Sequence, residues 1–263
     1  MESKLQPNTS TGPLAGFRNM LKIEGSRWLS PRTLITQSLV WLFAINFIGG
    51  MPLIVAPIVD GSEIVTLDMA SEIFIGIFSM VIAIGAIIVM QSSLVGEKQS
   101  GTAAWLLSNP ITRTSFVLSK LLANTLGLLF VAIILQGAIG YGIVSYALGS
   151  MLPVGAYLAS MGLQTLHMLF YITLTLALGA FFDSRGPIMG IGIMVVMIQD
   201  LLAGFLGSYL PWFPNILPKM LNVGSIMLNR GQSLPTALPI IATAVYTIVL
   251  TGLAIWRFKR TEF

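Results

Sequence analysis

The sequence predicts an all-α integral membrane protein with six transmembrane helices. Of its 263 residues, 55% are hydrophobic and only 9% are charged, and the mean hydropathy is +0.87. In an ordinary soluble domain about a quarter of the residues are charged. Six apolar runs also reach the roughly 20 residues that a helix needs to cross a bilayer. Lipid is therefore expected to surround most of residues 33–263, which form one transmembrane domain.

The apolar runs set the positions of the six spans. The third run is longer than a bilayer requires, so this helix either tilts or continues beyond the lipid. The spans are predicted at Thr33–Pro57, Ser71–Val95, Ser115–Leu148, Gly155–Phe182, Pro187–Tyr209 and Leu238–Arg257.

Residues 1–32 differ from the spans and are predicted to form a cytoplasmic tail and an interfacial amphipathic helix. Arg18 and Lys22 lie one turn apart, on a different face from the apolar residues, where they can approach anionic lipid headgroups. Ser30 and Pro31 then favour a new helix, with serine as its N-cap and proline at its first position. The apolar positions are Leu14, Phe17, Met20, Leu21 and Trp28.

The loops predict the orientation. Of the 14 lysines and arginines, all but Lys219 and Arg230 fall on the side that holds both termini. The positive-inside rule places that side in the cytoplasm, so we expect a multi-pass protein of a prokaryotic cytoplasmic membrane with both termini cytoplasmic. The loop after the first span is acidic, as expected for the outer side, with Asp60, Glu63, Asp68 and Glu72.

Residues 210–238 form an unusual outer loop. It holds several prolines, which break helices into short pieces, yet it remains apolar, with side chains such as Trp212 and Phe213. Irregular backbone at membrane depth must be covered by protein. We therefore predict short re-entrant helices before the last span.

Residues 96–114 form a charged loop between the second and third spans. Ser100 or Thr102 can cap a short helix, Gly101 permits a sharp turn, and Pro110 ends the helix. Large apolar side chains on such a helix are typical interface anchors, although they also suit a lipid surface. The candidate contact residues are Glu97, Gly101, Thr102, Trp105, Leu106, Leu107, Pro110 and Arg113.

The loop resembles a loop of known transporters. Its pattern is Glu97-x-x-x-Gly101-Thr102-x-x-Trp105-Leu106-Leu107-Ser108-x-Pro110-Ile111-x-Arg113, followed by Phe116 and Leu118-Ser119-Lys120. This pattern, together with the predicted topology, is similar to the permease subunits of ABC exporters of the six-span class. The family often has an acid where this chain has Ala104, so the matching surface of a partner can differ.

The resemblance implies that the loop is a coupling helix that docks on a separate ATP-binding subunit, present in two copies. ATP and Mg²⁺ would be bound by that subunit, and this chain would hold no cofactor. A second permease chain, identical or homologous, would complete the pathway, and no nucleic-acid partner is expected. The cargo is expected to be amphipathic or hydrophobic, such as a drug, a peptide or a lipid-like molecule.

Few polar side chains lie within the predicted spans. An ionisable residue inside a membrane is a functional candidate by default, so Asp200 and His167, with Gln164, are assigned to a tentative substrate path. The turn around Ser184 brings His167 and Asp200 to a similar height, although contact is not assured. Asp200 can instead pair with Lys219 or Arg230. Asn46, Gln91 and Gln136 are expected to join helices, and so is Gln164 as the alternative to a place on the path.

Two other function classes remain open. An ion-coupled carrier or channel could use Asp200 and His167. An intramembrane enzyme is disfavoured because the chain has one histidine and no cysteine. The glycines of the fifth span favour close packing, against a second permease copy or within one chain.

Overall fold

The computed structural model describes residues 12–59, 65–102, 106 and 111–261. Within these residues the chain forms helices and no strands. The α-helices are α1 (Phe17–Trp28), α2 (Pro31–Trp41), α3 (Ile48–Val59), α4 (Leu67–Met90), α5 (Val95–Gln99), α7 (Arg113–Leu128), α8 (Leu135–Leu148), α9 (Val154–Phe181), α10 (Arg185–Tyr209), α11 (Met220–Asn229) and α12 (Leu238–Lys259).

The prediction of six spans is confirmed. Six helical stretches of the described chain are long and apolar enough to cross a membrane. The first joins α2 to α3 and the third joins α7 to α8. The six stretches are Pro31–Val55, Leu67–Gln99, Arg113–Leu148, Val154–Phe181, Arg185–Tyr209 and Leu238–Lys259.

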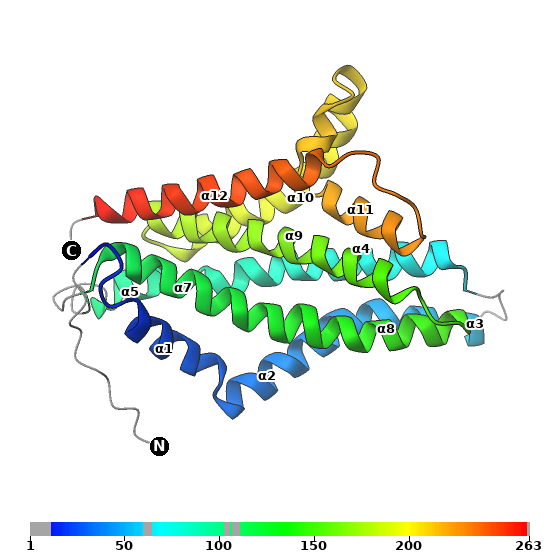
Figure 1. The fold of residues 1–263 in the computed structure, drawn as a ribbon, viewed down its shortest axis with the longest axis horizontal. Coiled ribbons are helices and arrows are strands. Elements are labelled where there is room, and N and C mark those ends of the chain that lie inside the picture. Colours follow the sequence, from blue (N-terminus) through cyan, green and yellow to red (C-terminus); the bar gives the residue numbers. More distant parts are fainter. Residues whose placement is uncertain (1–11, 60–64, 103–105, 107–110, 262–263) are drawn as a thin grey trace.

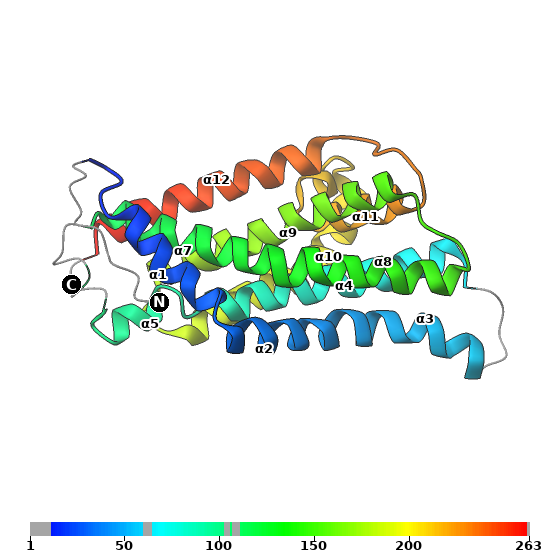
Figure 2. The ribbon, with the colours of Figure 1, turned by 60° about the horizontal axis from the view of Figure 1, so that its bottom comes forward.

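Figures 1 and 2 show an elongated bundle with α1, α5 and the end of α12 at one end and the tip of α3 at the other. The helix α9 forms its core and packs against α4, α7, α10, α11 and α12. In contrast, only 17% of the most apolar stretch of α10, and the same share of α12, is buried. These two helices are therefore the least buried of the six spans.

Side-chain caps start three of the helices. The Oγ of Ser30 accepts a hydrogen bond from the backbone N–H of Thr33, and Pro31 is the first residue of α2. Thr66 and Thr112 cap α4 and α7 in the same way. Because each cap satisfies a backbone N–H that the helix leaves free, these residues determine where the spans begin. The predicted restart at Ser30 and Pro31 is confirmed.

The first and third spans each contain one π-helical turn, at Leu42–Phe47 and Leu129–Ile134. A buried polar contact joins the spans beside these turns: the amide of Asn46 donates to Oε1 of Gln136 at 2.8 Å. Gln136 in turn donates to the carbonyl of Val131, within the π-helical turn of its own span. The predicted role of Asn46 and Gln136 in joining helices is confirmed.

The region before the last span contains short helices, as predicted. A 3₁₀ helix (Phe213–Ile216) is followed by α11, which packs against α9 and α4. Ser225 of α11 is fully buried and accepts a hydrogen bond from the amide of Gln164 on α9 at 3.1 Å. Gln164 therefore serves as a contact between two helices.

Candidate functional site

The loop after α4 is held to the bundle at its start. The Lys98 ammonium donates to the carbonyls of Ala180 and Phe182 at the end of α9 and pairs with Asp183 at 3.2 Å. The amide of Gln99 donates to the carbonyl of Asp183. The turn between α9 and α10 thus supports α5.

The backbone then turns sharply, as the sequence predicts. Gly101 has φ +71°, a left-handed conformation that glycine adopts without strain. The Oγ of Ser100 accepts weakly from the backbone N–H of Thr102 at 3.4 Å, and Thr102 and Leu106 are helical. Leu106 is half-buried against the core of this chain. The predicted contact residues Trp105, Leu107 and Pro110 lie outside the described residues.

The end of the loop is joined to the segment before α1 and to the end of α12. The backbone N–H of Thr112 donates to the carbonyl of Ala15, and its hydroxyl donates to the carbonyl of Pro13. Gly16 approaches Ile111 so closely that an added Cβ would lie 2.8 Å from its side chain. The guanidinium of Arg113 donates to the carbonyl of Lys259 at 2.5 Å. Both ends of the loop are therefore fixed to helices that span or border the membrane.

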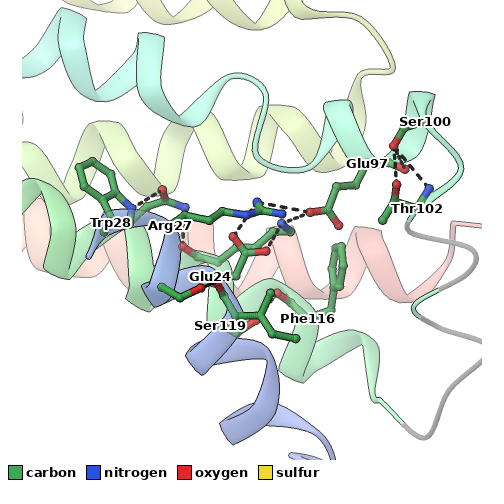
Figure 3. A network of polar contacts seen from close by, with 12 residues as sticks. Glu24, Arg27, Trp28, Glu97, Ser100, Thr102, Phe116 and Ser119 are labelled. Carbon is green, nitrogen blue, oxygen red and sulfur yellow. Dashed lines mark hydrogen bonds and ion pairs between the residues drawn. The ribbon is translucent and has the colours of Figure 1, made fainter. Parts of the chain in front are cut away.

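A buried ion network lies beneath the loop (Figure 3). The ammonium of Lys120 on α7 pairs with Glu24 of α1 at 2.7 Å and with Glu97 of α5 at 2.5 Å. The Lys120 side chain is 1% exposed. Arg27 of α1 pairs with Glu24 at 3.1 Å and reaches Glu97 at 4.0 Å. A single lysine therefore connects α1, α5 and the third span.

The same network borders a polar cavity of about 420 Å³ that also reaches Ser93, Thr102 and Arg185. The second carboxylate oxygen of Glu97 is buried and has no hydrogen-bond partner among the described residues. The sequence pattern identifies Glu97 as a contact residue and ends on Lys120, but it pairs Lys120 with neither Glu24 nor Glu97. A signal existed, because a lone acid in an amphipathic helix and a lone lysine near the start of a span both need a partner when they are buried.

A second polar cavity, of about 290 Å³, lies between α4, α9, α10 and α11. Both His167 and Asp200 line it, so the structure brings the two predicted residues to one cavity although neither contacts the other. His167 is buried, and its Nδ1 lies 3.1 Å from the hydroxyl of Ser79 on α4. Met80 and Met197 line the same cavity and are half or more exposed.

Hydrogen bonds extend along this cavity from α9 to α11. The amide of Gln199 donates to the hydroxyl of Tyr171 at 2.7 Å, and its oxygen accepts from the backbone N–H of Lys219 at 2.9 Å. The Lys219 ammonium pairs with the Asp200 carboxylate. Burial lowers the pKa of Lys219. Of the predicted alternatives for Asp200, the pair with Lys219 is therefore the one formed.

Asn222 of α11 lines this cavity and carries an unpaired group. Its Oδ1 is buried and accepts no hydrogen bond from the described residues. A buried acceptor without a partner is costly. Gln164, predicted to lie on the same path, does not line this cavity and is bonded to Ser225.

Comparison with known proteins identifies the family. The model of the "ABC-2 family transporter protein" matches residues 30–263. The chain belongs to the ABC-2 transporter family. This ABC-2 chain is similar to the "Uncharacterized transmembrane protein YxlG" of Bacillus subtilis (strain 168), with 25% identity over 211 residues, which cover 77% of this chain and 79% of the relative.

Membership of the ABC-2 family agrees with the six spans and makes this chain a multi-pass permease component of an ABC transporter. Such a permease carries out transport and in general pairs with an ATP-binding subunit. The matched region begins at residue 30, so it includes the loop of residues 96–114 and the cavity of His167 and Asp200, whereas Glu24 and Arg27 of the ion network precede it.

Proposed function

We propose that this chain is the permease subunit of an ATP-driven ABC exporter and forms half of the translocation pathway. The observation that carries the proposal is the network of Glu24, Glu97 and Lys120. It joins the loop after α4 to α1 and α7 through buried charges. A loop held in this way transmits a displacement to the membrane helices instead of bending alone.

Residues 97–113 would form the surface that docks on an ATP-binding subunit. The loop is held to the rest of the chain by Glu97, Leu106 and Arg113. It turns at Gly101 and Thr102. Trp105, Leu107 and Pro110 would complete the docking surface. Two ATP-binding subunits would bind ATP and Mg²⁺, and closure on nucleotide would push the loop against α5 and α7. The side that holds α1 and α5 would face the cytoplasm of a prokaryotic cell, with both termini on that side.

The cavity of His167 and Asp200 would be part of the cargo path. It combines Met80 and Met197 with hydrogen-bonding groups of Ser79 and Asn222, a lining that suits an amphipathic cargo. An ion-coupled carrier usually keeps ionisable groups available for its ion. Here Asp200 is paired with Lys219, which favours the exporter over that alternative.

A pull-down in mild detergent tests the proposal. The wild-type chain should recover an ATP-binding subunit with ATPase activity, and Trp105→Ala/Leu106→Ala should lose it. Truncating interface anchors of this kind typically costs 2 kcal/mol or more each, which is about 30-fold in affinity. The matched control is Leu253→Ala/Trp256→Ala, which removes the same side-chain types from the exposed face of α12.

The control variant should retain the subunit. If the wild-type chain purifies without an ATPase, or if the loop variant keeps the subunit as well as the control does, the coupling role of residues 97–113 is wrong.

A further inference from the structure

An apolar cavity of about 420 Å³ lies between α1, α2 and α7, and Trp28 separates it from the cavity of the ion network. Its volume falls in the range of small-ligand sites, about 300–1,000 Å³. Ten side chains and glycines line it: Leu21, Gly25, Trp28, Leu29, Leu34, Ala123, Leu126, Gly127, Phe130 and Val131. No charged side chain is among them, so the cavity suits a hydrocarbon chain.

Two glycines shape this cavity. An added Cβ at Gly127 would lie 2.1 Å from the ring of Trp28, so the absence of a side chain there lets the tryptophan lie flat on α7. An added Cβ at Gly25 meets nothing within 4 Å, so this glycine leaves open space on α1. Leu29 and Leu126 at the edge are 79% and 52% exposed, which means that the cavity opens sideways toward the lipid.

Cations lie beside the opening. One side of α1 and its C-cap carries residues spaced by four, three and four positions, namely Arg18, Lys22, Gly25 and Leu29. Arg18 and Lys22 are exposed, and no ion pair among the described residues involves either of them. Their charges are thus available to an anion at the membrane surface, one to two turns from the apolar cavity.

We propose that the cavity between α1, α2 and α7 binds an anionic phospholipid, with an acyl chain against Gly25, Trp28 and Leu126 and the headgroup at Arg18 and Lys22. The leaflet is the one at the α1 end of the bundle, which is the cytoplasmic leaflet in the orientation proposed above. Apolar burial gives the affinity, and the cations select the negative headgroup. The ATP-binding partner plays no part in this inference.

The lipid also has a structural consequence. Trp28 borders both this cavity and the polar cavity of the ion network, and its indole N–H donates to Asn124 at 3.1 Å. Asn124 donates to the carbonyl of Lys120 at 2.8 Å. A chain packed against Trp28 therefore stabilises α1 in the position in which Glu24 reaches Lys120.

Photo-crosslinking tests the site on the purified chain. The protein is placed in bilayers of phosphatidylcholine doped with a trace of photoactivatable phosphatidylglycerol or, separately, photoactivatable phosphatidylcholine, and labelled peptides are sequenced. The phosphatidylglycerol probe should label residues 21–34 and 123–131 more strongly than the phosphatidylcholine probe does. Gly25→Leu fills the cavity and should abolish this labelling. Gly142→Leu, in open space on α8, is the matched control and should not change it.

Removing the charges provides a second test that leaves the packing intact. Arg18→Gln/Lys22→Gln should weaken labelling by phosphatidylglycerol about five-fold per cation, the fold-change that corresponds to about 1 kcal/mol each near a charged surface. Lys259→Gln on exposed α12 is the control. Equal labelling by both probes, or unchanged labelling of Gly25→Leu, would overturn the proposal.

Discussion

At the scale of single residues, the buried charges of Glu24, Glu97 and Lys120 connect three helices of this protein. Lys120 is 1% exposed and balances two carboxylates from different elements. Removing one partner of a buried pair leaves the other charge uncompensated, which costs about 3–5 kcal/mol. The geometry of α1, α5 and α7 at this end of the bundle therefore depends on one ammonium group.

We expect Lys120→Met to lower the free energy of unfolding by about 3–5 kcal/mol, because Glu24 and Glu97 then face each other with Arg27 as their remaining cation. Thermal or denaturant unfolding of the purified chain measures this loss. Glu97→Gln/Lys120→Met removes one charge of each sign and should recover part of it. A melting temperature of Lys120→Met equal to that of wild type would contradict the role of the network.

Asn222 and Asn229 offer a matched pair on α11. Each has a buried Oδ1 without a hydrogen-bond partner among the described residues, but Asn222 alone lines the cavity of His167 and Asp200. Asn222→Leu should lower the stimulation of ATPase activity by amphipathic compounds, measured on the complex with its ATP-binding subunit. Asn229→Leu should leave it unchanged. If the two variants behave alike, the cavity is not part of the cargo path.

At the scale of helices, glycines determine how closely the spans approach one another. An added Cβ at Gly140 of α8 would lie 2.0 Å from the ring of Phe74 on α4, a contact that requires one of the helices to move. Gly142 of the same helix has nothing within 4 Å. Close approach through small residues is a principal source of helix association in membranes.

Gly140→Ala should therefore destabilise the protein by about 1–3 kcal/mol, the usual cost of overpacking. Gly142→Ala should be neutral or stabilising by up to about 1 kcal/mol, because alanine favours a helix more than glycine does. Unfolding in detergent compares the two variants directly. Equal stability of the two would show that α4 and α8 separate without cost.

At the scale of the whole molecule, α10 and α12 are the least buried spans. An added Cβ at Gly186, Gly190 or Gly204 of α10 would have no atom within 4 Å. These glycines therefore leave space on α10 in which a neighbouring helix could pack closely. Met197 of α10 also borders the proposed cargo cavity. A second permease chain packed on α10 would cover this surface and close the cavity from the side.

The absence of cysteine makes this arrangement simple to test. Met197→Cys, 65% exposed on α10, should give a crosslinked dimer with a short bis-maleimide in native membranes. Ile248→Cys, 71% exposed on α12, is the matched control and should remain monomeric. Crosslinking of both variants to the same extent, or of Ile248→Cys alone, would place the interface elsewhere.

Hydropathy and helix caps were enough to predict the six spans, the separate helix before the first span and the short helices before the last. These features depend on residues near one another in the sequence, as the capping of α2 by Ser30 illustrates. His167 and Asp200 line one cavity, which agrees with the similar height predicted for them, because every α-helix rises by the same distance per residue.

The tertiary structure alone decided which polar groups meet. Glu24 and Lys120 are 96 positions apart, and the Ser79 and His167 contact spans 88. Such pairs depend on the rotation of each helix about its axis. In a membrane the hydrophobic pattern does not determine that rotation, because lipid and protein interior are equally apolar. The buried network and both polar cavities therefore follow from packing, and only the individual residues that form them are visible in the sequence.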